Sequence, residues 1–231
     1  MVGNVFLIFL SLLFLFHTPV LGQADSRKRS DPFQLFVSFD DIPAGKLPQG
    51  WKTGATNARG GTSVWEVSEE RYAPSGNHVL TMRRAARLSG STFNLCWTDH
   101  IPFLNGSIEV RFKAVAGKVD QGGGIIWRVQ NDSNYYIVRF NPLEENFRLY
   151  VVENGRRSML ATADIHLAPE KWHHIRIVHH DDEISCYLDG KPLLTKTDRR
   201  ITKAGGVGLW TKADAVTSFD NFSLTMKKER P

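Results

Sequence analysis

Short runs of β-branched and aromatic residues, separated by turn residues, recur along almost the whole chain. Between them we find no capped amphipathic stretch that predicts a helix. Many short strands without helices favour two packed antiparallel sheets, so we expect an all-β sandwich. The twelve candidate strands are 34–39, 63–67, 78–82, 92–97, 106–114, 124–130, 135–141, 146–152, 172–178, 183–188, 206–211 and 217–226.

Two dipeptides between candidate strands predict tight hairpins. Asn154-Gly155 and Asp189-Gly190 can supply the two positive φ angles that a type I′ turn requires. No repeat of fixed period and no linker interrupts the chain after its first 32 residues. We therefore expect one domain over residues 33–226, followed by a short basic tail at 227–231.

The first 22 residues have the pattern of a signal peptide. Residues 5–16 are almost purely apolar, Pro19 ends any helix, and the small residues Val20 and Gly22 suit a cleavage site. Residues 23–32, which include Arg27-Lys28-Arg29, are expected to form a flexible leader. The alternative is an uncleaved anchor, and both interpretations predict a secreted or periplasmic domain. No later apolar run is long enough to span a bilayer.

Charge and cysteine content exclude several classes of protein. The net charge is +5, from 29 Lys and Arg against 24 Asp and Glu, and it is spread along the chain, which does not favour nucleic acid as a partner. Two cysteines cannot form a disulfide-dense scaffold, although Cys96 and Cys186 can be either one disulfide or two buried thiols. Asn105, Asn131 and Asn221 begin glycosylation sequons.

Three consecutive candidate strands place polar side chains on one face. Side chains of a strand alternate between its two faces, and one set here is apolar and predicted to be core: Trp127, Tyr136, Val138, Phe140, Phe147, Leu149 and Val151. The opposite set is the candidate ligand site: Arg128, Tyr135, Arg139, Asn141, Arg148 and Tyr150. Planar cationic donors beside aromatic rings suit a saccharide. The alternative is a solvated face of cross-strand pairs.

This interpretation treats the arginines as surface groups. Arg139→Ala should then leave folding almost intact, within about 0.5 kcal/mol, while weakening saccharide binding. Glu153 is the acid nearest in sequence that can compensate the clustered cations, since a strand end can twist.

Acidic residues near both ends predict a calcium site, although no cofactor is required. Asp40 and Asp41 follow the first candidate strand and Asp220 lies in the last, and these strands should pair. Calcium prefers six to eight oxygen ligands, and carboxylates at such a junction can provide some of them. The alternative places Asp40 and Asp41 in a turn and pairs Asp220 with a surface cation.

Catalytic candidates are few. His100 lies close to Asp99, and Lys212 and Asp214 follow a glycine-rich strand. Each can take part in acid–base chemistry, but for the last two a surface hairpin with a nearby ion pair is the favoured interpretation. Two histidine pairs, 173–174 and 179–180, lack the ligand spacing of a zinc site.

Five stretches in the second half of the chain carry a family resemblance: 123–128 (Gly-Gly-Ile-Ile-Trp-Arg), 170–173, 187–191, 206–211 and 218–222. With them, residues 106–226 resemble the concanavalin A-like lectin/glucanase superfamily. The closest similarity is to its 3-keto-disaccharide hydrolase and laminin-G-like domains. The resemblance implies a jelly roll of two curved antiparallel sheets in a glycan-related protein.

The residues expected for catalysis in that family are absent. Gly122-Gly123-Gly124 replaces an Asn-Ser-Gly opening, and no Glu-x-Asp-x-x-Glu run occurs. We therefore expect a secreted jelly roll that recognises a saccharide on its curved polar sheet. One alternative is an enzyme, a hydrolase or lyase of 3-keto glycosides that recruits His100, Lys212 or Asp214. The other is a protein–protein adhesion module.

Overall fold

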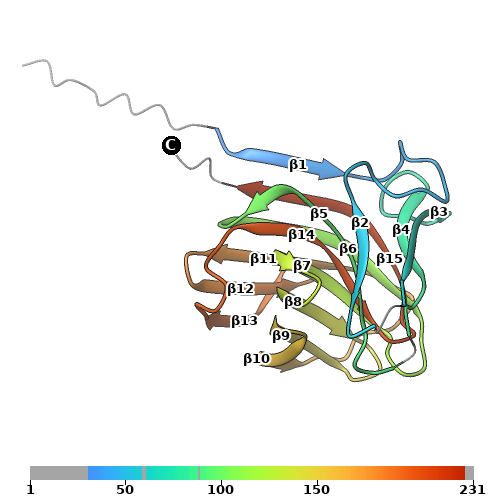
Figure 1. Ribbon diagram of the computed structural model, residues 1–231. Helices are drawn as coiled ribbons and strands as arrows, with labels where there is room; N and C mark the ends of the chain where they lie inside the picture. Colours follow the sequence, from blue (N-terminus) through green and yellow to red (C-terminus); the bar gives the residue numbers. More distant parts are fainter. Residues whose placement is uncertain (1–30, 59–60, 88, 227–231) are drawn as a thin grey trace, which may run out of the picture. The chain divides into compact units, whose positions relative to one another are not determined.

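Fifteen strands form the regular structure of the residues that the computed structural model describes, 31–58, 61–87 and 89–226, and no helix occurs among them (Figure 1). Sheet A contains β1 (Phe33–Val37), β3 (Val64–Glu69), β4 (His78–Arg84), β6 (Gly106–Ala116), β11 (Trp172–His180), β12 (Glu183–Leu188), β13 (Lys191–Thr197) and β15 (Val216–Met226). Sheet B contains β2 (Lys52–Thr56), β5 (Phe93–Phe103), β7 (Gly123–Asn131), β8 (Asn134–Asn141), β9 (Asn146–Glu153), β10 (Arg156–Asp164) and β14 (Gly205–Lys212).

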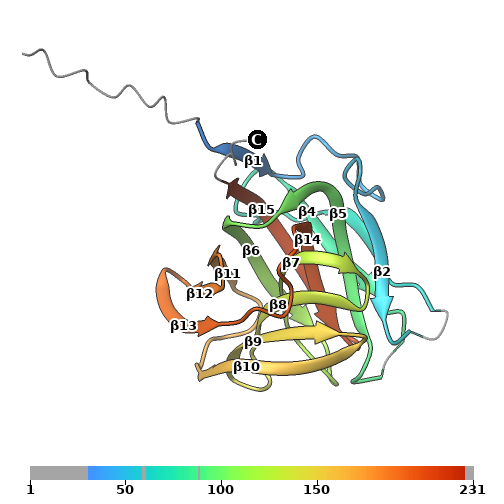
Figure 2. The same cartoon turned by 60° about the vertical axis from the view of Figure 1, so that its left-hand side comes forward.

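The two sheets are antiparallel throughout. Sheet A has the order β13-β12-β11-β6-β15-β4-β3, with β1 paired to β15, and sheet B has the order β10-β9-β8-β7-β14-β5-β2. Figure 2 shows β10, β9, β8 and β7 stacked one above the other within sheet B. This confirms the predicted jelly-roll sandwich and the predicted pairing of the first strand with the last.

All twelve candidate strands are present, and all but 183–188 have altered ends. Three further strands were not among the candidates, although the two predicted hairpins imply a strand after Gly155 and after Gly190. These three, β2, β10 and β13, lie at ends of the strand order in the two sheets. Edge strands are half solvated and need no regular apolar alternation, as the exposed positions of β10 and β13 show. Alternation therefore detects inner strands better than edge strands.

Both predicted hairpins are confirmed by their backbone angles. Asn154 and Gly155 have φ of 49° and 76°, and Asp189 and Gly190 have φ of 49° and 77°. These are the left-handed conformations of a type I′ turn.

The core between the sheets confirms the predicted strand alternation. Each of the seven predicted core residues, among them Trp127, Phe140 and Val151, is fully buried in one apolar cluster. Cys96 of β5 and Cys186 of β12 belong to the same cluster and are free buried thiols. Because their thiols are buried, the pKa of each is raised.

Sheet B curls so strongly that its face away from the core is concave. β10 and β5 are five strand positions apart, which is roughly 24 Å on a flat sheet. Yet the guanidinium of Arg157 in β10 lies 4.9 Å from the ring of Phe93 in β5. Thr56 of β2 likewise reaches Tyr135 of β8, with 2.8 Å between their hydroxyl oxygens. Side chains on this concave face are therefore largely buried by the sheet itself.

The predicted signal peptide (1–22), most of the leader (23–32) and the basic tail (227–231) lie outside the described residues. Asp31 and Pro32 have no regular structure, and the strands run from Phe33 to Met226.

Candidate functional site

One end of the concave face of sheet B carries five charged residues in mutual contact, which we call the concave cluster: Asp120, Arg139, Glu144, Arg148 and Lys212. Arg139 of β8 and Arg148 of β9 are directly opposite in the strand register. Both bind Glu144, with Oε2 2.6 Å from Arg139 Nη2 and 3.0 Å from Arg148 Nη1.

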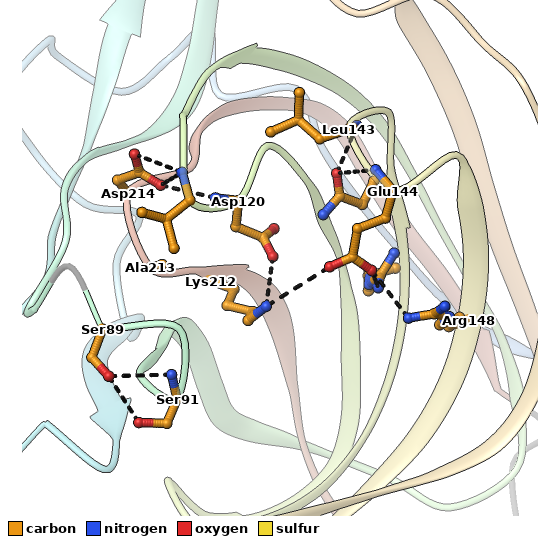
Figure 3. Close-up of polar contacts among 12 residues, drawn as sticks. Ser89, Ser91, Asp120, Leu143, Glu144, Arg148, Lys212, Ala213 and Asp214 are labelled. Carbon is orange, nitrogen blue, oxygen red and sulfur yellow. Dashed lines mark hydrogen bonds and ion pairs between the residues drawn. The ribbon is translucent and has the colours of Figure 1, made fainter.

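Lys212, at the end of β14, joins the two acids of the cluster. Its Nζ lies 2.9 Å from Asp120 Oδ2 and 3.9 Å from Glu144 Oε1 (Figure 3). The side chains of Asp120 and Arg139 are each 1% exposed, whereas those of Glu144 and Arg148 are 35% and 31% exposed. The cluster therefore has a buried floor and a partly open rim.

Two loops hold the acids in place through side-chain to backbone hydrogen bonds. The carboxylate of Asp214 accepts the N–H groups of Lys118, Val119 and Asp120 at 2.8–2.9 Å, which fixes the β6–β7 loop. The side-chain oxygen of Asn141 accepts the N–H of Leu143 at 2.9 Å, which starts the β8–β9 turn that carries Glu144. Both acids are thus preorganised without a ligand.

Several buried polar atoms of this region have no partner among the described residues. They are Oδ1 of Asp120, Nε of Arg139, Nδ2 of Asn141 and Nη1 of Arg157. Buried polar groups are almost always hydrogen-bonded, and leaving one unpaired costs about 1–3 kcal/mol. Unpaired atoms grouped around one charged cluster are a mark of a binding site.

The two acids of the concave cluster have opposite pKa shifts. Burial raises the pKa of Asp120 above its usual value of 3.8, although Lys212 and Arg139 oppose the shift. Burial also acts to raise the pKa of Glu144, but the charges of Arg139 and Lys212 outweigh it, so this pKa is lowered. The two environments therefore move the pKa values of the two carboxyl groups apart.

Next to the cluster, the concave face is apolar. Its aromatic and aliphatic residues form a second buried cluster: Phe93, Leu95, Trp97, Ile126, Val129, Tyr135, Ile137, Tyr150, Val152 and Trp210. We expected Tyr135 to be part of the ligand site. Instead it is fully buried and hydrogen-bonded to Thr56, so it is not available to stack on a ligand. Tyr150 is 4% exposed and hydrogen-bonded to Arg139 at 3.3 Å.

A polar cavity of about 400 Å³ adjoins the end of β14 that carries Lys212. It is lined by Asn57, Arg87, Ser89, Ser91 and Thr92. Ala213, which follows Lys212, donates its N–H to the carbonyl of Thr92 at 3.0 Å. Figure 3 shows the hydrogen-bonded pair of Ser89 and Ser91 together with Lys212 and Ala213.

The expectation that Arg128 lies in the ligand site beside Arg139 is wrong. Arg128 has a φ of 47°, and the register between β7 and β8 shifts after Trp127. This bulge turns the side chain away from Arg139, and the guanidinium donates to the backbone carbonyls of Leu104, Asp181 and Ile201 at 2.7–3.1 Å. Arg128 is a buried structural residue.

Two further expectations about the arginines are wrong. Arg139 is not a surface group, because it is 1% exposed and bonded to Glu144, Asn146 and Tyr150. The compensating acid is Glu144, whereas Glu153 lies 3.6 Å from Arg200. Of the six predicted ligand residues, Arg139 and Arg148 belong to the concave cluster, and Asn141 and Tyr150 contact it.

The three catalytic candidates do not lie together. Lys212 belongs to the concave cluster, but Asp214 is occupied by three backbone N–H groups. His100 lines an apolar cavity of about 680 Å³ beside Ile101 and Pro102. That cavity lies at the opposite end of the β5–β14 pair, because Gly205 faces Phe103 there whereas Lys212 faces Phe93.

The acids proposed for calcium are arranged around backbone donors. Asp40 accepts the N–H groups of Asn77 and His78, and Asp220 accepts that of Ser75. Asp40 also contributes to the raised pKa of Asp220, so the two carboxylates are close, as expected. Asp41 is exposed. N–H groups directed at these oxygens do not fit a cation, and no group of three metal-ligating side chains occurs within the described ranges.

Sequence reasoning missed Asp120, Glu144 and Arg157. Glu144 lies in the short turn between the strands of Arg139 and Arg148, and this position was the available signal. Asp120 and Arg157 gave no local signal, because only the strand order brings them to this face.

Comparison with known proteins agrees with this fold. Residues 37–225 match the family model of the 3-keto-alpha-glucoside-1,2-lyase-like domain, so the chain belongs to that family. No curated protein sequence matches the chain significantly. No helix among the described residues is long and apolar enough to cross a membrane.

Solved structures are similar to the chain over most of its length. The carbohydrate-binding module CBM66 from Bacillus subtilis is 20% identical with a TM-score of 0.59, covering 75% of this chain and 94% of that one. The laminarinase catalytic domain from Thermotoga petrophila is 10% identical with a TM-score of 0.55, covering 86% and 99%. Domain 4 of the arabinanase AbnA from Geobacillus stearothermophilus, in complex with arabinotriose, is 8% identical with a TM-score of 0.54, covering 86% and 94%. At these identities the likeness concerns the fold.

Proposed function

We propose that the chain binds a saccharide at the concave cluster. The observation that carries this proposal is the set of buried, unpartnered polar atoms around the cluster. Sugar hydroxyls both donate and accept hydrogen bonds, so they match a floor that offers the carboxylate of Asp120 and the guanidinium of Arg139 together.

The rim of the cluster suits the apolar faces of a sugar ring. Val119 and Leu143 are 55% and 52% exposed, and each directly precedes one of the cluster acids. Small-molecule sites combine apolar lining with a few fixed polar groups. The family of the chain and the names of its structural neighbours support a carbohydrate as the ligand class, while the geometry supports the place.

Binding is tested with a glycan array, followed by titration calorimetry on the best hit. Arg148 lies on the open rim, and Arg148→Gln should weaken binding at least tenfold, about 1.4 kcal/mol. Arg176→Gln is the matched control, because Arg176 is a partly exposed arginine on sheet A. Equal affinity in the wild type and Arg148→Gln would contradict this site. An array without any hit would contradict the function and favour an adhesion module.

A second candidate function is cleavage of a 3-keto glycoside by elimination. The specific observation is Asp120, whose Oδ1 is buried without a partner and whose pKa is raised. As a carboxylate it can remove the proton from the carbon beside the keto group. Lys212 can donate a hydrogen bond to the enolate oxygen. Collapse of the enolate then forms the carbon–carbon double bond and breaks the bond to the glycosidic oxygen, which leaves as an alcohol with the proton that Asp120 has taken up.

Turnover separates the two candidates. Wild-type protein is incubated with a 3-keto glycoside, and release of the leaving sugar is followed with time. If the enzyme reading holds, the rate rises with pH through the raised pKa of Asp120, and Asp120→Asn abolishes turnover while the glycoside still binds. Binding without turnover in the wild type would contradict this candidate.

We also propose that the protein is exported, on the signal-like pattern of residues 1–22. Cleavage after Gly22 predicts a mature chain that begins at Gln23. N-terminal sequencing of protein collected outside the cytoplasm tests this, and an intact leader on that protein would indicate an uncleaved anchor instead.

A further inference from the structure

Arg157 is a largely buried cation to which the structure gives no acidic partner. It lies in β10 on the same face as Val152, its register partner, and extends across the concave face. Its guanidinium carbon lies 4.3 Å from the ring of Tyr150, 4.9 Å from Phe93 and 5.9 Å from Trp210. Among the described residues it forms no ion pair, and Nη1 is buried without a hydrogen bond.

Such an arrangement is unfavourable in a protein without a ligand. Aromatic rings attract a cation, but they do not supply the hydrogen bonds that a guanidinium loses on leaving water. Burial, and to a lesser extent the charge of Arg139, lowers the pKa of Arg157, although Tyr150, Asp120 and Glu144 oppose the shift. The rings therefore fix the plane of the guanidinium and leave its N–H groups to another partner.

The charge balance around Arg157 shows what kind of partner is missing. Arg139, Arg148, Arg157 and Lys212 supply four positive charges, and Asp120 and Glu144 supply at most two negative ones. Protonation of Asp120 would enlarge this surplus. The buried guanidinium atoms without a partner, Nε of Arg139 and Nη1 of Arg157, are both donors. The site therefore lacks an anionic acceptor.

We propose that the saccharide bound on the concave face is acidic, and that Arg157 pairs with its carboxylate or sulfate group. This inference rests on the proposed function and specifies the class of ligand. A planar guanidinium held between rings is suited to two parallel hydrogen bonds with such a group. Val119 and Leu143 remain available to the apolar face of the same ligand.

The test compares acidic saccharides with neutral counterparts by titration calorimetry. The probes are trigalacturonic acid with its carboxyl-reduced form, and a sulfated disaccharide with its desulfated form. We expect at least one acidic probe to bind tenfold or more tightly than its neutral counterpart, and the pair that shows this preference identifies the anionic group. A neutral form that binds as well as its acid would overturn this inference but leave the proposed function standing. Absence of binding by all four probes overturns the inference too, while the glycan array reports separately on the function.

Variants at neighbouring positions assign the preference to Arg157. Arg157→Gln should lose the preference for the acidic probe and retain its affinity for the neutral form. Arg156→Gln is the matched control, because Arg156 is exposed on the same strand with the opposite alternation. Arg157→Lys keeps the charge but loses the planar fork, so it should retain only part of the preference and serves if the glutamine variant does not fold. The role of Arg157 would be overturned if folded Arg157→Gln kept the preference for the acidic probe. If Arg157→Gln does not fold, an unchanged preference in Arg157→Lys would overturn it.

Discussion

Lys212 lies with its ammonium nitrogen 2.9 Å from Oδ2 of Asp120, while Oδ1 of the same carboxylate is buried without a partner among the described residues. The pair is almost inaccessible, with side-chain exposures of 12% and 1%. One oxygen of a buried carboxylate is thus neutralised, and the other remains to accept a hydrogen bond. This relationship explains why Asp120 is central to both candidate functions.

Removal of Lys212 should leave a buried carboxylate without its cation. We expect Lys212→Met to lower the free energy of unfolding by about 3–5 kcal/mol at pH 7, the usual cost of breaking a buried pair. The loss should shrink at lower pH, because protonated Asp120 no longer needs a cation. Urea unfolding at a series of pH values from 7 downward measures both effects, with the exposed Lys191→Met as control. A loss that stays equal down to strong acid would contradict the assignment.

Glu144 should stabilise the fold only where it is ionised. Its pKa is lowered in the folded protein, so its contribution is fully present above the unfolded value of about 4.5 and is lost as the pH falls through the folded value. Glu144→Gln should therefore lower the melting temperature at pH 7, and the difference from wild type should disappear in strong acid. Thermal unfolding at a series of pH values checks this. A difference that persists unchanged at low pH would show that Glu144 acts by packing alone.

Arg128 should matter for folding and not for binding. Arg128→Met leaves three backbone carbonyls without their donor, each of which accepts from a charged group. We expect a loss of about 3 kcal/mol or more in the free energy of unfolding, with unchanged saccharide affinity for the folded fraction. The exposed Arg199→Met is the control. Weaker saccharide binding by folded Arg128→Met would restore Arg128 to the site.

Strand alternation predicted the core and placed Arg139 and Arg148 on one face of the sheet, because a period of two needs only that the chain be extended. It failed at Arg128, because one residue with positive φ moves the side chains that follow it in β7 to the opposite face of the sheet. A bulge of this kind has no clear mark in the sequence.

Curvature is the second property that alternation does not reveal. A flat sheet would expose Tyr135 and Arg139, whereas the curled sheet buries both. Arg139→Ala should therefore destabilise the protein instead of leaving it intact, because Glu144 and Asn146 would lose their partner. Asp120 lies on the β6–β7 loop, whose position depends on strand order and is not set by local pattern.

His179 should make stability depend on pH in mildly acidic solution. It is fully buried, and its Nδ1 accepts a hydrogen bond from Trp127 Nε1 at 2.9 Å, so the folded protein holds the neutral ring. Burial, together with the charge of Arg128, lowers its pKa from 6.5 to about 3. Between these values the unfolded chain binds a proton that the folded protein does not. The contribution of neutral His179 to the free energy of unfolding is therefore fully present above pH 6.5. It falls by up to about 1.4 kcal/mol per pH unit as the pH drops toward 3.

His179→Asn isolates this effect, because the amide oxygen can accept the same hydrogen bond without titrating. Between pH 6.5 and 4, we expect the free energy of unfolding of His179→Asn to change less with pH than that of wild type. The difference in slope should be up to about 1.4 kcal/mol per pH unit. Chemical unfolding at four pH values measures it, and His166→Asn, with a side chain 85% exposed, is the matched control. If wild type and His179→Asn lose stability in parallel over this range, His179 is protonated in the folded protein and its ring is not held neutral by the core.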